Sequence, residues 1–373
     1  MKVHFSYAII LFHHVVRSVL AELSNTIALE PNEVAIMEDE FEIGYVQSLI
    51  LEDTPLYSSK SIYQDIKMYQ SKHYGKVFVL DDCLQLTERD AAHYNEMLAH
   101  VPIAEYMAKN VDKINSSDAF LRVLVIGGGD GYVVSEVLKH TSVAYVDHVD
   151  LDEEVIKSSE KIFPWAADLW QNDRVNLHIA DGSKFVKEQL EKGISYHIII
   201  QDASDPFYYD KDDQIVILPS SVLYTREHFE TMYHLLKAEN GVMTMQGETY
   251  NIPSNLVEIK KWLGLLTDIG FQQSRYGSIS IGTYPTGQIG FITSHATDDV
   301  EKDVCFSSQS CDEFHGLDET DFQKIKQYFS KALVDKSTKY YHPRIHRSSF
   351  DLPLWVETFI YAKDDDELKT EDK

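Results

Sequence analysis

The sequence VLVIGGGDG at residues 123–131 decides the fold. Its first four residues form a continuous apolar run, which is typical of a strand buried on both faces of a sheet. The glycines that follow, among them Gly127 and Gly129, let the backbone turn sharply and approach a ligand closely. The helix expected next offers free N–H groups at its N-terminus. Strand, glycine turn and helix in this order predict a nucleotide or nucleoside site.

Apolar strands and helices alternate on the C-terminal side of this stretch. Strands are expected at 143–149, 175–179, 196–200, 241–245 and 290–293, and helices through 139 and at 153–162, 183–191 and 319–333. This rhythm predicts an α/β fold with a Rossmann-like, doubly wound, mostly parallel sheet. On the N-terminal side, short runs rich in β-branched and aromatic residues at 62–69 and 76–80 predict a small antiparallel β domain.

These patterns divide the chain into four parts. Residues 1–35 form an N-terminal extension that is either a targeting segment or disordered. Residues 36–115 form the N-terminal β domain with a linking helix at 88–107. Residues 116–363 form the Rossmann-like catalytic domain, with insertions at 207–218 and 298–319. Residues 364–373 form an acidic tail that we expect to be disordered.

Composition excludes several classes of function. The formal net charge of −26 argues against nucleic acid, because phosphate contacts need lysine and arginine clusters. No stretch is long and apolar enough for a membrane helix. The cysteines Cys83, Cys305 and Cys311 lack the spacing of a metal site. Cys305 and Cys311 could pair in an oxidising compartment, but thiols in a reducing cytosol are favoured, so we expect a cytoplasmic protein without a metal.

Acidic residues follow the first three strands of the alternating region. Asp150 ends the second strand about 20 residues after the glycine turn, where an acid typically binds ribose hydroxyls. Asp130 lies inside the turn, where it would repel a phosphate but attract a cation; capping the next helix is the alternative. Asp181 and Gly182 follow the third strand. Asp181 could accept a hydrogen bond from an adenine amino group, although Asp-Gly is also a common turn.

Two further carboxylates follow the fourth strand. Asp202 and Asp205 lie three residues apart in DASDP, residues 202–206. A carboxylate near an amine can hold it and accept its proton as the nitrogen becomes a nucleophile. A solvated turn that ends at Pro206 is the structural alternative.

With these residues in place, the sequence resembles the spermidine synthase family. The glycine turn and the acids at the strand ends match in order and spacing. So do YQD at 63–65, QLTERDAAHYNEM at 85–97, QGE at 246–248, TYPTGQIGF at 283–291 and the segment 346–353. The resemblance covers about residues 40–360. It implies a methyltransferase-type Rossmann domain with a small N-terminal β domain, usually dimeric, and no cofactor beyond the co-substrate, decarboxylated S-adenosylmethionine.

The resemblance also implies roles at the amine site. Asp202 would deprotonate or orient the attacking amine of putrescine, and Tyr63 would assist it. Asp205 and Tyr284 would hold the diamine, and Gln246 would contact it through water. Transfer of the aminopropyl group would then give spermidine and methylthioadenosine.

At the donor site, the implied contacts run from the aminopropyl group to the adenine. Gln64 and Asp130 would hold the aminopropyl end, beside Gly127 and Gly129 of the turn. Asp150 would bind the ribose, and Asp181 with Gly182 the adenine.

Several positions depart from the family pattern. Tyr132 replaces a glycine, and we expect its ring to crowd the donor. Ala203 replaces a serine. A donor-contacting glutamine is expected near residue 50, and Gln47 could supply it only with a gap. The loop after Asp205 is about ten residues longer than in the family and ends with Ser221 in place of a glutamate.

Three functions remain open at this stage. The first is spermidine synthesis. The second is a related reaction on the same scaffold: spermine or thermospermine synthesis, or putrescine N-methylation, which Asp130 disfavours because it would repel the carboxylate of an intact donor. The third is a non-catalytic, polyamine-binding relative, which the altered loop favours and the intact Tyr63, Asp202, Asp205 and Tyr284 disfavour.

Overall fold

The computed structural model describes residues 29–110, 112, 119–209, 214–297, 319–332 and 338–362. The tail at 364–373, most of the N-terminal extension, and the insertion with Cys305 and Cys311 lie outside the described residues. In the part that is described, no helix has the length and apolar character needed to cross a membrane.

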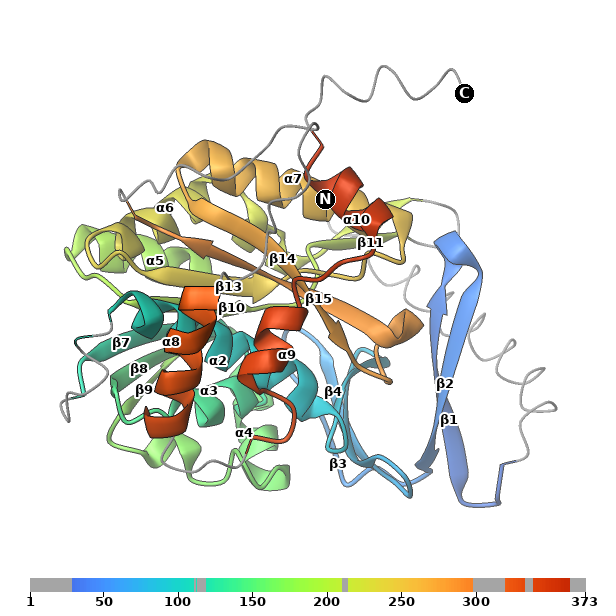
Figure 1. Ribbon diagram of the computed structural model, residues 1–373. Coiled ribbons are helices and arrows are strands. Elements are labelled where there is room, and N and C mark those ends of the chain that lie inside the picture. Colours follow the sequence, from blue (N-terminus) through green and yellow to red (C-terminus); the bar gives the residue numbers. More distant parts are fainter. Residues whose placement is uncertain are drawn as a thin grey trace, which may run out of the picture.

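The apolar run at 123–126 becomes strand β7 (Leu121–Gly127) near the centre of a seven-stranded sheet (Figure 1). The strand order is β14-β15-β13-β10-β7-β8-β9. The other strands are β8 (Val143–Asp150), β9 (Val175–Ile179), β10 (Ile198–Asp202), β13 (Val242–Gln246), β14 (Gln272–Ser280) and β15 (Gln288–His295). The first five strands of this sheet in chain order pair in parallel, and β14 and β15 are antiparallel. The predicted mostly parallel sheet is therefore confirmed.

Helices cover both faces of this sheet. Val123 and Val125 of β7 pack into a core with α2, α3 and α8, whereas Leu124 and Ile126 pack into a core with α5, α6 and α7. The helices are α2 (Ala91–Lys109), α3 (Tyr132–Val137), α4 (Glu153–Ile162), α5 (Gly182–Glu191), α6 (Arg226–Lys237), α7 (Pro253–Ile269), α8 (Glu319–Ala332), α9 (Pro343–Ser348) and α10 (Leu354–Ile360). This alternation explains why the run at 123–126 is apolar at every position.

The N-terminal region forms the predicted antiparallel structure in two pieces. Its strands are β1 (Glu33–Glu40), β2 (Tyr45–Glu52), β3 (Tyr57–Lys60), β4 (Asp65–Ser71), β5 (Gly75–Leu80) and β6 (Cys83–Thr87). Strands β3 to β6 form a four-stranded sheet, while β1 and β2 form a separate two-stranded hairpin at the edge of the molecule (Figure 1). The hairpin begins three residues before the expected boundary at 36.

Helix α2 continues through Pro102. A proline inside a helix has no N–H for the carbonyl four residues earlier, here that of Leu98. The hydroxyl of Thr244 on β13 donates to this carbonyl at 3.0 Å, which compensates for the missing bond. The helix therefore reaches Lys109 and forms the buried link between the two β regions.

The C-terminal segment is attached to α2 by a buried acid. Glu105 accepts hydrogen bonds from Arg275 at 2.6 Å and is bonded to His295 and His346 at 2.7 and 3.1 Å. Burial alone would raise the pKa of Glu105, but Arg275 and the two histidines outweigh it and hold that pKa well below its usual range. The segment 346–353, which matches the family pattern, is therefore held to α2 through the contact of His346 with Glu105.

The insertion after Asp205 forms a small hairpin. Strands β11 (Phe207–Tyr209) and β12 (Ile215–Ile217) pair antiparallel, with Phe207 opposite Ile217. Residues 210–213 of the insertion lie outside the described part. The hairpin leads into a 3-10 helix, Pro219–Tyr224, that contains Ser221.

Candidate active site

The glycine turn lies between the carboxyl ends of β8 and β10. Gly127 and Gly128 have φ angles of +79° and +67°, which favour glycine. The N–H of Gly128 donates to the carbonyl of Asp202 at 2.8 Å. A Cβ on Gly128 would lie 2.8 Å from Asp202 Oδ2, and one on Gly129 would lie 2.8 Å from Asp150 Oδ2. The turn therefore needs glycine because it lies directly against these two carboxyls.

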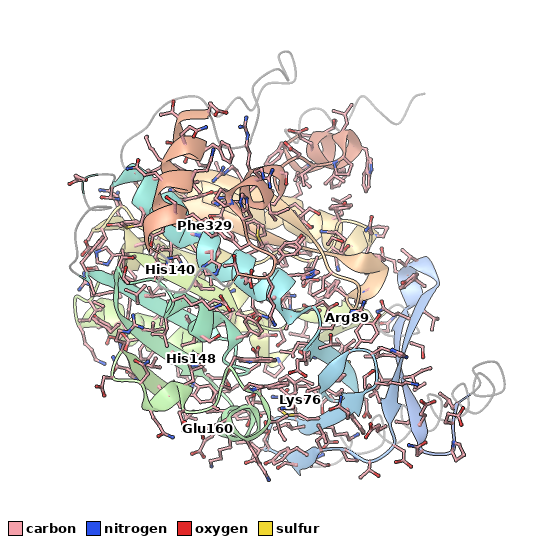
Figure 2. All side chains as sticks on the ribbon, turned by 60° about the horizontal axis from the view of Figure 1, so that its bottom comes forward. Lys76, Arg89, His140, His148, Glu160 and Phe329 are labelled. Carbon is pink, nitrogen blue, oxygen red and sulfur yellow. The ribbon has the colours of Figure 1, made fainter. Side chains whose placement is uncertain are left out.

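His148, which is labelled in Figure 2, lies on strand β8 and is bonded to the glycine turn. Its Nε2 is bonded to the carbonyl of Gly127 at 2.8 Å, and Trp170 Nε1 donates to its Nδ1 at 2.8 Å. Burial lowers the pKa of His148 to about 4. The ring is therefore neutral near pH 7, with its proton on Nε2 directed at Gly127.

Three acidic side chains converge at this edge of the sheet. Burial and, next, the charge of Asp202 raise the pKa of Asp130 to about 8. Burial raises the pKa values of Asp150 and Asp202 to about 6. Neighbouring carboxylates repel one another, so each makes it harder for the others to ionise. A bound cation offsets this repulsion and favours the ionised forms. The turn is therefore acidic, and the binding of a cation there stays a prediction.

Asp130 also organises the start of α3, although the N-cap of that helix is Gly131 rather than Asp130. Its Oδ1 accepts the N–H of Tyr132 at 2.8 Å at the start of α3. Trp165 Nε1 donates to the Asp130 carbonyl at 2.9 Å. The same residue therefore organises the turn and places a carboxyl beside Asp202, so its structural role does not exclude a role in binding.

Asp202 ends strand β10, two residues beyond the end expected from the sequence. Its Oδ1 accepts a hydrogen bond from the hydroxyl of Tyr94 on α2 at 3.0 Å. That bond lowers the pKa of Asp202, against the larger effect of burial. Tyr94 was not predicted as a site residue, although it lies in the matched segment 85–97. At helical spacing its ring is indistinguishable from a core aromatic.

A second acidic group lies beside the first. The side-chain amide of Gln246, at the end of β13, donates to Asp205 Oδ1 at 2.6 Å and to Glu248 Oε1 at 3.0 Å. The hydroxyl of Tyr284 donates to Glu248 Oε2 at 2.8 Å. Asp205, Gln246 and Tyr284, predicted separately, are thus connected through Glu248.

Glu248 is the second functional candidate that sequence reasoning missed. It is only 4% exposed and its φ of +54° is unusual for a residue other than glycine. The QGE motif contained the signal, but only the glutamine received a role. A buried acid held in a rare backbone conformation is a common feature of binding sites.

The predicted donor residues Gln64 and Asp181, and the predicted amine-site residue Tyr63, have different surroundings. Gln64 Nε2 donates to Asp152, a residue the sequence did not single out, at 3.0 Å. Tyr63 lies on the turn before β4 and is 47% exposed. Asp181 caps α5 by accepting the N–H of Lys184 at 3.1 Å. A Cβ on Gly182 would meet Ile126 at 2.6 Å, so packing alone requires this glycine.

Two departures from the family pattern are clarified. The side chain of Tyr132 is 5% exposed and packs against Trp165, with 4.7 Å between ring centroids, in a core cluster that includes Phe163. This placement argues against the expectation that its ring crowds the donor. Gln47, on β2, donates to the carbonyl of Gly282 at 3.2 Å, beside the loop that holds Tyr284.

Two family models and several curated relatives match this chain. The family model described as spermine/spermidine synthase domain matches residues 91–304, and the one described as spermidine synthase tetramerisation domain matches residues 51–88. The chain is 33% identical over 307 residues to the spermidine synthase of Schizosaccharomyces pombe, covering 82% of this chain and 86% of the relative. It is 33% identical to spermidine synthase 2 of Datura stramonium, and the match covers 86% of this chain and 87% of the relative. It is 31% identical to the spermine synthase of Arabidopsis thaliana, and the match covers 84% of this chain and 75% of the relative.

Solved structures share the fold. A spermidine synthase crystallised with the transition state analogue AdoDATO aligns with a TM-score of 0.68 at 24% identity, covering 90% of this chain and 99% of the other. The spermidine synthase from Thermotoga maritima aligns with a TM-score of 0.66 at 24% identity, and the alignment covers 90% of this chain and 98% of the other. The matched domain spans more than half of the chain, and the curated relatives align over most of it. The chain therefore belongs to the spermine/spermidine synthase family.

Proposed function

We propose that this protein is a spermidine synthase, which transfers the aminopropyl group of decarboxylated S-adenosylmethionine to putrescine. The observation that carries the proposal is the convergence of Asp130, Asp150 and Asp202 on the glycine turn. A sulfonium nucleoside with a terminal ammonium suits such a site. A pyrophosphate-containing nucleotide does not, because its negative charges would further oppose the ionisation of these three carboxyls.

In the proposed reaction, an amine nitrogen of putrescine attacks the aminopropyl carbon next to the sulfonium. The new C–N bond forms as the C–S bond breaks, and the electron pair of the broken bond remains on sulfur. Asp202 accepts the proton that the nitrogen loses. The products are spermidine and methylthioadenosine. Fixing both reactants in line can lower the barrier by several kcal/mol, on the order of known proximity effects.

We assign the binding roles as follows. Tyr63 orients the attacking nitrogen, and Asp205 with Gln246 and Tyr284 binds the far ammonium of the diamine. Gln64 and Asp130 bind the aminopropyl end of the donor, Asp150 the ribose, and Asp181 with Gly182 the adenine. The hydrogen bonds that join Asp205, Gln246, Glu248 and Tyr284 support the amine assignments.

The direct test is product analysis. The purified protein is incubated with putrescine, cadaverine or spermidine, each with decarboxylated or intact S-adenosylmethionine, and the products are identified by mass spectrometry. We expect spermidine and methylthioadenosine from putrescine and the decarboxylated donor alone. No product in any mixture, from folded protein that binds methylthioadenosine, would instead identify a non-catalytic relative.

A longer amine is the second candidate acceptor, because the inserted hairpin borders a small recess next to Asp205. The recess is lined by Asp205, Pro206, Phe207, Glu248, Asn255, Glu258 and Trp262. Phe207 belongs to the inserted hairpin, so the insertion contributes a wall of this recess. Faster turnover of spermidine than of putrescine in the same assay would assign the protein to spermine or thermospermine synthesis.

Removing the Tyr94 hydroxyl should change the pH dependence. Because the Tyr94 hydrogen bond lowers the pKa of Asp202, Tyr94→Phe should raise this pKa from about 6 by about one unit. The acid limb of the kcat/KM profile should move to higher pH by the same amount. The rate should then be several-fold lower at pH 6.5 and close to wild type at pH 9. A loss that is equal at every pH would contradict this role.

We also propose that the protein is a cytoplasmic homodimer. The match at residues 51–88 to a tetramerisation domain supports self-association. The cytoplasmic location rests on the cysteine pattern of the sequence, which favours thiols in a reducing compartment. Sedimentation velocity should give twice the mass of one chain, and a species of four chains would contradict the dimer.

A further inference from the structure

A short turn carries Tyr63 and is organised by one hydroxyl group. The N–H groups of Tyr63 and Gln64 both donate to Ser61 Oγ, at 3.0 and 3.1 Å. The N–H of Ser61 donates back to the carbonyl of Gln64 at 3.0 Å. The position of the Tyr63 backbone is therefore determined by where Ser61 Oγ is held.

Asp152 holds that hydroxyl from the other domain. Its Oδ2 accepts hydrogen bonds from Ser61 Oγ at 2.6 Å and from Gln64 Nε2 at 3.0 Å. Its Oδ1 accepts the N–H of Glu154 at 3.1 Å as the N-cap of α4. Asp152 is itself only 4% exposed. A buried carboxylate with partners on both oxygens has a fixed orientation.

The same residue contacts the donor side of the site. The N–H of Asp152 donates to Asp150 Oδ1 at 2.8 Å. Asp150 is the proposed ribose ligand, and Tyr63 is proposed to orient the amine. A continuous chain of hydrogen bonds therefore runs from Asp150 through Asp152 and Ser61 to the Tyr63 backbone.

Apolar packing contributes little to holding this turn. Ile62 is 90% exposed and Tyr63 is 47% exposed, so neither side chain is anchored in the core. Segments with few buried apolar contacts depend on hydrogen bonds for their local order. Two hydrogen bonds to Asp152 join this turn to the Rossmann domain.

We propose that Asp152 is a positioning residue, which acts through Ser61 to place Tyr63 against the amine and Gln64 against the donor. The proposal deepens, and rests on, the proposed spermidine synthase function. It assigns Asp152 a role beyond capping α4, because only Oδ1 is used for the cap.

A neighbouring contact provides a matched control. The hydroxyls of Tyr57 and Ser59, on β3, donate to Glu154 Oε1 at 2.5 and 2.7 Å. This contact joins the same two domains but does not involve the turn at 61–64. Ser59→Ala therefore removes a hydroxyl from the same domain boundary without releasing Tyr63.

The first measurement is hydrogen exchange without substrate, in the full-length protein. Asp152→Asn keeps an N-cap oxygen for α4, because asparagine caps as well as aspartate. Its amide would, however, face the donors of Ser61 and Gln64. Exchange should accelerate at 61–64 in Asp152→Asn and in Ser61→Ala, but not in Ser59→Ala. Exchange at 61–64 that is unchanged from wild type would overturn the proposal, whatever reaction the protein catalyses.

The second measurement is a double-mutant cycle. Ser61→Ala should lower kcat about 10-fold, since small displacements of a reacting group are costly. In the Tyr63→Phe background, the same change should lower kcat less than 3-fold, because its effect passes mainly through Tyr63. Fully additive losses would overturn the positioning role. An inactive wild type would overturn the proposed function instead, and the exchange result would still decide the role of Asp152.

Discussion

Replacing Asp202 with asparagine lowers kcat by about 10²- to 10⁴-fold, the usual range for loss of a general base. Asparagine keeps the shape of the side chain and an oxygen that can accept the Tyr94 hydrogen bond, but it cannot accept a proton from the amine. The KM for the donor should change only a few-fold. Rates of methylthioadenosine formation, measured by mass spectrometry at saturating substrates, give the comparison.

The pH profile separates this role from a structural one. Burial raises the pKa of Asp202 to about 6, so wild-type kcat/KM should fall as the pH decreases through 6 and the carboxylate is protonated. The kcat/KM of Asp202→Asn should not show this fall through pH 6. Ser204→Ala, at an exposed position two residues along the chain, is the control and should be unchanged. If Asp202→Asn kept turnover within a few-fold of wild type, Asp202 would not be the proton acceptor.

The central part of the fold was predictable because its signals are local. Strand β9 and helix α4 have the expected bounds, since a short apolar run and an amphipathic repeat specify each without tertiary information. Strand β14 was not predicted because its sequence, QQSRYGSIS, is mostly polar. Its buried Arg275 donates a hydrogen bond to Glu105 on α2, and its Ser274 accepts one from Ser294 on β15. Such pairings depend on residues far apart in the chain.

In the candidate site, too, residues with a local signal were predictable and residues that depend on distant contacts were not. The acids at strand ends were predictable because parallel strands place their carboxyl ends at one edge of the sheet. Tyr94 and Asp152 were not predictable. Tyr94 lies on a helix whose pattern is that of a core helix, and the position of Asp152 is that of an ordinary helix cap. Their contacts with Asp202 and Ser61 arise only when the N-terminal domain packs against the Rossmann domain.

Replacing Asp130 with asparagine should weaken donor binding by about 10²-fold, because truncating one partner of a buried charge pair typically costs 2–5 kcal/mol. The donor carries an ammonium group for Asp130 to bind, whereas the product methylthioadenosine has none. Calorimetric titration of the variant should therefore show the loss for decarboxylated S-adenosylmethionine and an almost unchanged affinity for methylthioadenosine. An equal loss for both ligands would mean that the substitution disrupts the glycine turn rather than removing a charge.

The same substitution should stabilise the ligand-free protein, increasingly so at high pH. The pKa of Asp130 is about 8 in the folded protein, against roughly 3.9 in an unfolded chain. Between these values the folded state binds more protons than the unfolded state, so this group makes stability fall as the pH rises toward 8. Asparagine has no proton to lose. The melting temperature of Asp130→Asn minus that of wild type should therefore increase from pH 5 to pH 8.5, a difference in which groups common to both proteins cancel. A difference that stays constant over this range would show that Asp130 is already ionised without its ligand. The glycine turn would then attract the donor with a permanent charge on Asp130, and binding would release no proton.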